Sequence, residues 1–428
     1  MMKNRTKRKS CIYYVMDSFN RAGGLEHQCS RLAKRMKDPG YQVAVFSRKY
    51  VTKHNQYYRY FKENDIDLIQ INYVLYHLLR SMVWLCVIML YIVLSFMYWL
   101  KKRKSIVFTF SGFNKELGYE LRRVEEYIFN ITFIINLRIK GFFKKPDVLH
   151  VVSPYPATMI SLKWAEKEGI ALVYDEQFMA GFDYHKEKYQ QIYRVASVFK
   201  VLSYALGEHA AKYIPSNLKL VVIPPLLDMP RFLEKKNDSQ LTIGSIGRVE
   251  HEKGFEFFIE AAKEVHEIFP SVKYVLVGEG RFLSQMKKMV SDLGLEGCFV
   301  FKGYLPHDDI HLFLSEIDIY VQSSRTEGAG IAIVEAMSHG KPVISTACGG
   351  PVSLVKEGET GLLIPPKEPK CLAAALMRLI NNPSERLRMG KNGREVFLRE
   401  HNPNDMVEQY IQMYEELINN KTCKLSKK

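Results

Sequence analysis

Two glutamates separated by seven residues mark the segment EGAGIAIVEAM, residues 327–337. Glu327 and Glu335 enclose a stretch that carries no other charge. Three small residues follow the first glutamate: Gly328, Ala329 and Gly330. Small residues let a backbone approach a ligand closely, and free N–H groups at a helix start bind phosphate. A carboxylate pairs well with adjacent ribose hydroxyls, so the segment predicts a site for a sugar–diphosphate–nucleoside. The alternative is an ordinary amphipathic helix with one exposed glutamate.

A second candidate group lies in GRVEHEKG, residues 247–254. Arg248 and Lys253 flank a short loop between a predicted strand and a helical pattern. Two fixed cations there can neutralise a diphosphate leaving group, which is work that a metal ion does elsewhere. We therefore expect neither a metal site nor a cofactor. The D-x-D pair Asp65 and Asp67 precedes an apolar run rather than following a strand, and we interpret it as surface acids.

Short apolar runs alternate with helical patterns almost throughout the chain. The predicted strands of the first half cover residues 11–16, 41–47, 105–110, 147–152, 170–175 and 198–203. Those of the second half cover residues 241–247, 272–278, 298–303, 317–322 and 342–347. This alternation indicates βα repeats around parallel sheets, and five or six strands per half predict two doubly wound α/β domains.

The proline-rich, polar segment 224–240 is the best candidate for a linker between the two halves. We expect a first domain at residues 1–225 and a second at 226–428, whose last helix crosses back to the first domain. Binding sites of doubly wound sheets lie at the carboxyl ends of the strands. The cleft between the domains is therefore the expected site.

The composition indicates a globular chain of 428 residues, with 47% hydrophobic and 25% charged residues. Its seven cysteines form no C-x-x-C pair, which favours a reducing compartment over a disulfide framework or a zinc site. Residues 1–150 carry 27 Lys and Arg against 11 Asp and Glu, whereas the rest carry 34 against 35. Nucleic acid, an anionic membrane or an anionic substrate could explain this excess. Because no nucleic-acid-binding signature is present, we do not expect a nucleic-acid partner.

Residues 82–100 form a run of nineteen residues without a charge, long enough for a transmembrane helix. A span would separate the first strands from the rest of their own sheet. Basic residues also flank the run on both sides, at Arg80 and at 101–104. Together with the apolar stretch 127–145, we interpret it as a monotopic patch that enters one leaflet. The alternative is a pair of buried helices, although a helix on a sheet normally keeps a polar stripe toward water.

The chain resembles the retaining glycosyltransferases of family 4, which have the GT-B fold of two facing Rossmann-like domains. The resemblance covers nearly the whole chain and is strongest at residues 241–366. SSRTEGAGIAIVEAMSHGKPVISTACGG resembles the family signature, GRVEHEKG its Arg/Lys loop and VGEGRFLSQM, which contains Gly278, its second glycine turn. AGGLEHQCSRLAKRM and VLSYALGEHAAKY match weaker patterns.

The resemblance implies a role for each matching residue. Glu335 would hold the ribose, and Arg248 and Lys253 the diphosphate. The residues expected to face the transferred sugar and distal phosphate are Glu327, Gly328, Ala329, Gly330 and Ile331. Gly23 and Gly24 would approach from the other domain.

Two positions depart from the family pattern. Ser353 stands where members often have an acid, and Gln177 stands where many have a histidine. The family mechanism is front-face substitution, in which the leaving phosphate accepts the proton of the acceptor. Gln177 can hydrogen-bond a sugar but cannot shuttle a proton, and a lone histidine such as His150 or His185 is more often structural.

The sequence therefore predicts a metal-independent, retaining hexosyltransferase at the cytoplasmic face of the membrane, attached peripherally. Its substrates would be a nucleotide-sugar donor and a lipid-linked or polysaccharide acceptor in envelope glycan synthesis. A nucleotide-sugar epimerase or sugar phosphorylase of the same fold is an alternative, although neither explains residues 82–100. A non-catalytic nucleotide-sugar-binding protein is another, although the intact pairs Glu327/Glu335 and Arg248/Lys253 speak against it.

Overall fold

The structure is a computed structural model in which most of the chain outside residues 71–144 can be described. The described residues are 10–19, 24–70, 81, 89, 126, 130, 131, 133–136, 139, 145–153, 155–177, 186–229 and 240–426. The predicted strand 105–110 and the apolar run 82–100, except Met89, lie outside them. Among the described residues, no helix has the length and apolar character needed to cross a membrane.

The described residues of the first half form a parallel sheet of seven strands in the order β3-β2-β1-β4-β5-β6-β7. Its strands are β1 (Cys11–Met16), β2 (Gln42–Ser47), β3 (Asp67–Ile69), β4 (Val148–Val152), β5 (Ala171–Glu176), β6 (Val198–Val201) and β7 (Lys219–Val222). The connecting helices whose bounds the described residues define are α1 (Gly24–Lys37), α2 (Gln56–Glu63), α5 (Pro156–Glu168), α7 (Lys186–Val195) and α8 (Tyr204–Ala211).

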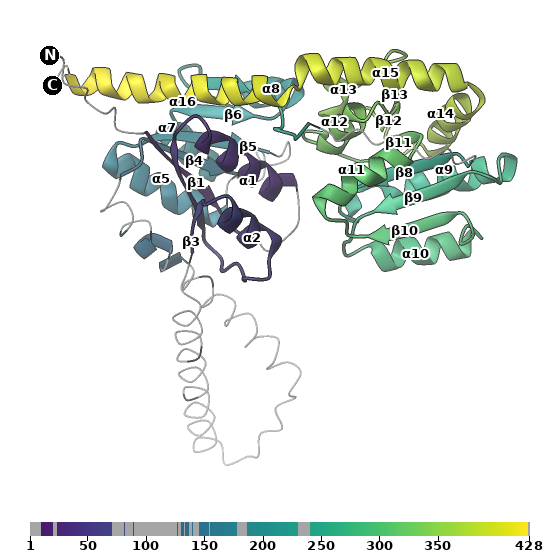
Figure 1. Cartoon of the computed structure of the whole chain (residues 1–428), viewed down its shortest axis with the longest axis horizontal. Helices are drawn as coiled ribbons and strands as arrows, with labels where there is room; N and C mark the ends of the chain where they lie inside the picture. Colours follow the sequence, from purple (N-terminus) through teal and green to yellow (C-terminus); the bar gives the residue numbers. More distant parts are fainter. Residues whose placement is uncertain are drawn as a thin grey trace, which may run out of the picture.

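The second half forms a parallel sheet of six strands in the order β10-β9-β8-β11-β12-β13. Its strands are β8 (Thr242–Ile246), β9 (Lys273–Val277), β10 (Phe299–Gly303), β11 (Ile319–Gln322), β12 (Val343–Thr346) and β13 (Gly361–Ile364). Its helices are η1 (His251–Lys253), α9 (Phe255–Ile268), α10 (Leu283–Asp292), α11 (His307–Glu316), α12 (Ile331–Ser338), α13 (Pro351–Leu354), α14 (Pro369–Asn381) and α15 (Pro383–Glu400). Figure 1 shows the two sheets side by side, each with its own helices.

Helices cover both faces of each sheet, because side chains on a strand alternate between its two faces. On β1, Tyr13 packs with residues of α5, α7 and α8, whereas Tyr14 packs with residues of α1 and α2. On β9, Leu276 packs with α9 and α14, whereas Val275 packs with α11, α12 and α15. Both halves are thus three-layer α/β units, and the predicted α/β class is confirmed.

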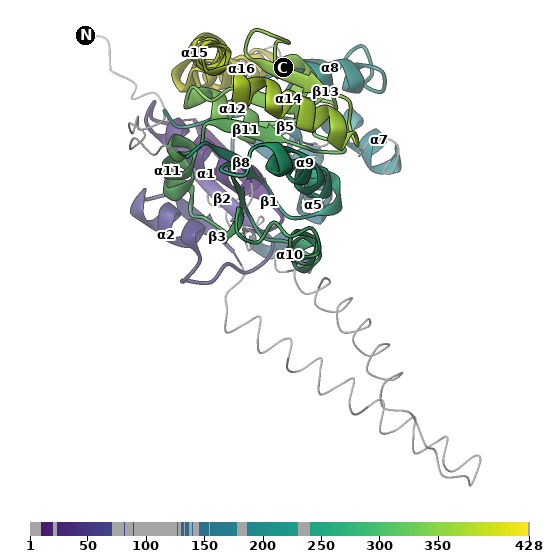
Figure 2. The same cartoon turned by 90° about the vertical axis from the view of Figure 1, so that its right-hand side faces the viewer.

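The last helix, α16 (Pro403–Ser426), packs on the first sheet although it follows the helices of the second. Tyr410 and Tyr414 of α16 are buried in the same core cluster as Tyr14 of β1. His150 of β4 also touches α16, since its Nδ1 lies 2.7 Å from the Tyr414 hydroxyl. The turned view in Figure 2 keeps α15 and α16 together along one side of the molecule.

The direction of strand order reverses at one point in each sheet, between β1 and β4 and between β8 and β11. Ligands of open α/β sheets bind beyond the carboxyl ends of the strands at such a point. In the second sheet, the segments that follow β8 and β11 are the two predicted motifs, GRVEHEKG and SSRTEGAG. The fold therefore brings together two groups of residues that lie about seventy positions apart in the chain.

Candidate active site

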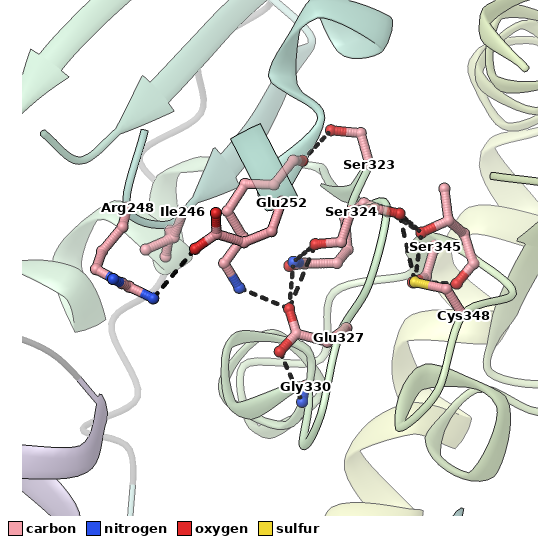
Figure 3. Close-up of polar contacts among 12 residues, drawn as sticks. Ile246, Arg248, Glu252, Ser323, Ser324, Glu327, Gly330, Ser345 and Cys348 are labelled. Carbon is pink, nitrogen blue, oxygen red and sulfur yellow. Dashed lines mark hydrogen bonds and ion pairs between the residues drawn. The ribbon is translucent and has the colours of Figure 1, made fainter. Parts of the chain in front are cut away.

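Glu327 lies in the loop between β11 and α12, and four donors surround its carboxylate. Oε2 accepts hydrogen bonds from the Lys253 ammonium at 2.6 Å and the Gln322 amide at 3.0 Å. The Ser324 hydroxyl, at 3.3 Å from Oε2, and the Gly330 N–H, at 3.4 Å from Oε1, complete the set, as Figure 3 shows for the labelled residues. Burial alone would raise the pKa of Glu327, but Lys253 and these donors hold it below its usual value. The carboxylate is therefore ionised and fixed in orientation.

Lys253 and Arg248 both follow β8, but their surroundings differ. Lys253 ends η1, its side chain is mostly buried, and it forms an ion pair with Glu327. Arg248 is half-exposed, and its guanidinium lies 3.3 Å from Oε1 of Glu252. The structure thus joins Lys253 directly to Glu327. Arg248 instead contacts Glu252 of the same turn, and both residues are labelled in Figure 3.

The glycine-rich loop enters α12 through a left-handed residue. Gly330 has φ +65° and is the N-cap of α12, and a Cβ at this position would lie 2.8 Å from Cδ1 of Leu354. The backbone angle favours glycine here, whereas the end of the Leu354 side chain could shift to admit a Cβ. Ala329 is buried, and Ile331, the first residue of α12, is half-buried. The predicted helix is confirmed, and its amino-terminal N–H groups lie next to the Glu327 carboxylate.

Glu335 lies within α12, one turn beyond the helix start. Burial raises its pKa to about 7; the charge of Arg31 opposes this shift, and that of Asp228 adds to it. Arg31 belongs to α1 of the first half, and its Nε lies 3.1 Å from Oδ2 of Asp228 in the segment that joins the halves. The pKa of Glu335 therefore depends in part on charged residues outside the second half.

The remaining predicted residues are placed less directly. Gly278 has φ +138°, and a Cβ there would lie 1.9 Å from the carbonyl oxygen of Gly247, so strand packing already requires glycine. Gln177 is buried at the end of β5, and its N–H donates to Oε1 of Glu176 at 2.8 Å. Gly24 is the first residue of α1, whereas Gly23 lies outside the described residues.

Several residues around the site have no counterpart in the sequence-based prediction. Gln322 and Ser324 are the polar side chains at the end of β11, and the position after a strand could have indicated them. Arg31 and Asp228 come from distant segments, and no local pattern identifies them. Within the part of the chain that the structure describes, no group of three or more His, Cys, Asp or Glu is arranged to hold a metal ion.

Comparison with known proteins identifies relatives of the part of the chain that carries this site. Residues 230–396 match the family of glycosyl transferases group 1. The chain is 31% identical over 169 residues to the lipopolysaccharide core biosynthesis glycosyltransferase LpsE of Rhizobium meliloti. That match covers 40% of this chain and 48% of the relative, so the chain spans about half the length of LpsE.

Solved structures share the fold over nearly the whole chain. Sucrose-phosphate synthase from Thermosynechococcus elongatus superposes with a TM-score of 0.72 at 17% identity, covering 96% of this chain and 100% of the other. HepE of Anabaena in complex with UDP-glucose gives a TM-score of 0.71 at 17% identity, covering 95% and 99%. The chain therefore has the GT-B fold, and its second sheet with the associated helices carries the region that matches glycosyl transferases group 1.

Proposed function

We propose that this protein is a retaining glycosyltransferase of family 4 that uses a nucleotide-sugar donor. The observation that carries the proposal is the Lys253–Glu327 ion pair at the start of α12, with Glu335 one turn inside the same helix. This arrangement offers a cation and helix N–H groups to a diphosphate and a carboxylate to a ribose. The match of residues 230–396 to glycosyl transferases group 1 and the UDP-glucose complex of HepE support this assignment.

In the proposed reaction, the bond between the sugar anomeric carbon and the distal phosphate oxygen breaks. Lys253 and Arg248 stabilise the negative charge that develops on the leaving diphosphate, without a metal ion. The acceptor hydroxyl attacks from the same face, and its proton passes to the leaving phosphate. Glu327 keeps Lys253 in place and faces the transferred sugar, while Gln177 donates a hydrogen bond to the sugar. The free energy of the transition state is thus lowered mainly by preorganised charge.

We also propose that the acceptor is a lipid-linked or polysaccharide glycan, reached at the cytoplasmic face of the membrane. The name of LpsE refers to lipopolysaccharide core biosynthesis, which supports an envelope glycan as acceptor. A helical stripe of exposed isoleucines supports membrane contact: Ile131, Ile135 and Ile139 are 39%, 46% and 54% exposed. The same segment is anchored to the first sheet, because Phe133 packs on Phe46 with ring centroids 6.5 Å apart.

The test is turnover of a panel of nucleotide-sugars by the purified full-length protein. We expect slow release of the free nucleoside diphosphate from one donor, unchanged by EDTA. NMR of the released sugar should show that the anomeric configuration is kept. Complete loss in EDTA that magnesium restores would contradict the metal-free mechanism, and an inverted sugar would contradict retention. Conversion of the donor into its epimer would assign an epimerase instead, and nucleotide binding without turnover of any donor would contradict an enzymatic function.

A further inference from the structure

Ser203 connects the first half of the chain to the glycine-rich loop of the second. It is the N-cap of α8, with extended backbone angles of φ −149° and ψ 156°. Its hydroxyl accepts a hydrogen bond from the Leu206 N–H at 3.2 Å, as an N-cap should. The same hydroxyl donates to the carbonyl oxygen of Gly328 at 3.1 Å. A serine can do both because a hydroxyl has one proton and two lone pairs.

The second half confines the same loop from its other side. The Gly350 N–H donates to the carbonyl oxygen of Glu327 at 2.9 Å. A Cβ at Gly350 would lie 2.5 Å from the carbonyl oxygen of Gly328, so this turn packs directly on the oxygen that Ser203 contacts. Leu354 of α13 packs against Gly330 at the end of the loop. The peptide groups after Glu327 and Gly328 are therefore held from two directions.

We propose that Ser203 is a positioning residue that sets the shape of the loop at residues 327–330 across the contact between the two halves. A peptide unit is planar and trans, so fixing the Gly328 carbonyl also fixes the direction of the Ala329 N–H. Ala329 directly precedes Gly330, the N-cap of α12, so its N–H lies in the loop where the proposed function places the distal phosphate. Ser203 reaches the loop only while the two halves are docked, so docking and loop shape are coupled. This role rests on the proposed transfer reaction.

Three substitutions separate the two hydrogen bonds of Ser203. Ser203→Thr keeps both bonds. Ser203→Asp keeps an acceptor for the Leu206 N–H but cannot donate to the Gly328 carbonyl, whereas Ser203→Ala loses both. We expect kcat to fall about ten- to a hundredfold in the Asp and Ala variants, since small misplacements of reacting groups cost this much. The dissociation constant of the nucleoside diphosphate should rise by a smaller factor than kcat falls, because Arg248, Lys253 and Glu335 are untouched.

A helix-cap role alone would give a different pattern. If Ser203 only caps α8, Ser203→Asp would keep the melting temperature and kcat of the unsubstituted protein, and only Ser203→Ala would lose stability. That result would overturn the proposal. Ser203→Thr should restore normal turnover, and a failure to do so would also count against it.

Amide hydrogen exchange at residues 327–331 gives a readout that does not depend on catalysis. We expect faster exchange in the Asp and Ala variants and unchanged exchange in the Thr variant, relative to the unsubstituted protein. Equal exchange in all four proteins would overturn the positioning role even if the enzyme is active. If the unsubstituted protein turns over no donor, the proposed function fails, but the exchange measurement still decides whether Ser203 shapes the loop.

Discussion

The Lys253 ammonium lies 2.6 Å from Oε2 of Glu327, although the two residues are 74 positions apart in the chain. Both side chains are mostly buried, at 18% and 13% exposure, so the pair is shielded from solvent more than a surface ion pair. Each residue follows a strand at the point where the strand order of the second sheet reverses. The topology therefore creates the ion pair, and the ion pair fixes a cation next to the start of α12.

Replacing this cation should reduce turnover far more than it reduces stability. We expect Lys253→Ala and Arg248→Ala to lower the rate of diphosphate release by about a hundred- to a thousandfold, which corresponds to about 2.7 to 4 kcal/mol of transition-state stabilisation. Steady-state kinetics with the accepted nucleotide-sugar measure the loss.

Lys263→Ala is the matched control, because Lys263 forms an exposed pair with Glu267 on α9. Its turnover should stay within a few-fold of the unsubstituted protein. If Lys253→Ala and Arg248→Ala also stay within a few-fold, these residues do not hold the leaving diphosphate.

The sequence predicts the described inner strands well but misses three of the four strands at the edges of the sheets. All described strands from β8 to β12, and β1, β2, β4, β5 and β6, overlap predicted strands. The three that were missed are β3, β7 and β13, which end their sheets. An edge strand pairs with a neighbour on one side only, so it can form from a short segment with few apolar residues. Whether such a segment is a strand then depends on pairing with its neighbour in the sheet, which its own sequence does not reveal. Asp67 illustrates this: it is exposed, as expected of a surface acid, but it also begins β3.

The sequence predicts those features of the site that depend on residues close together in the chain. The start of α12 at Gly330 follows from glycine and helix patterns within a few residues. The contacts of Ser203 with Gly328, and of Arg31 with Asp228, join segments 125 and nearly two hundred residues apart. Such contacts depend on how the two halves dock, and no periodicity or composition in either segment encodes their partners.

Glu335→Gln should weaken nucleotide binding while keeping the fold. The amide retains the shape of Glu335 but accepts from only one oxygen, so it should hold the two ribose hydroxyls less well. Calorimetry with the free nucleoside diphosphate should show a dissociation constant about tenfold higher, since a hydrogen bond to a charged group contributes about 1.5 to 3 kcal/mol. Unchanged affinity would indicate that Glu335 is a structural residue of α12.

The pH dependence of Glu335 gives a second test, because rising pH should increase nucleotide affinity but decrease the contribution of Glu335 to stability. Burial raises the pKa of Glu335 from its ordinary 4.5 to about 7, so the folded protein retains a proton that the unfolded chain has lost in this window. The contribution of Glu335 to the free energy of unfolding therefore falls as pH rises from 4.5 to 7. Nucleotide affinity should rise over the upper part of this window as the carboxylate forms. Glu335→Gln should lack both of these trends. The free energy of unfolding of the variant minus that of the unsubstituted protein should therefore increase by up to about 3 kcal/mol between pH 4 and pH 8.

A buried ion pair beneath α16 should be important for the stability of the first half. Lys200 lies 3.1 Å from both carboxylate oxygens of Asp175, and the two side chains are 0% and 7% exposed. Lys200→Met leaves the Asp175 charge buried without this partner, which should cost about 3 to 5 kcal/mol in urea unfolding. Lys219→Met is the control, because its pair with Glu416 of α16 is half-exposed and should contribute at most about 1 kcal/mol. Equal losses in both variants would contradict this account.

The isoleucine stripe offers the sharpest test of membrane contact within the described residues. Ile131, Ile135 and Ile139 recur every four residues, so they share one helix face, while Arg48 holds the opposite side through Glu126 at 2.5 Å and Asn130 at 3.1 Å. Replacing all three isoleucines with serine should therefore leave the first half folded. It should lower binding to anionic liposomes about a hundredfold, if each half-exposed side chain contributes about 1 kcal/mol on burial. The matched control replaces Ile268 and Leu387 with serine. Both lie on the second half and are more exposed than the three isoleucines.

Salt separates the apolar contribution from the electrostatic one. The basic run at residues 101–104 should add attraction to anionic headgroups that high salt screens. The unsubstituted protein should thus be partly retained on liposomes in high salt, whereas less of the triple isoleucine variant should be retained. Retention of the triple variant equal to that of the unsubstituted protein would show that this helix face does not meet lipid. The control substitutions lie on the second half. An equal loss of liposome binding in that control would mean that exposed apolar residues promote binding wherever they lie on the surface. Either result would remove the stripe as the reason for placing the first half against the membrane.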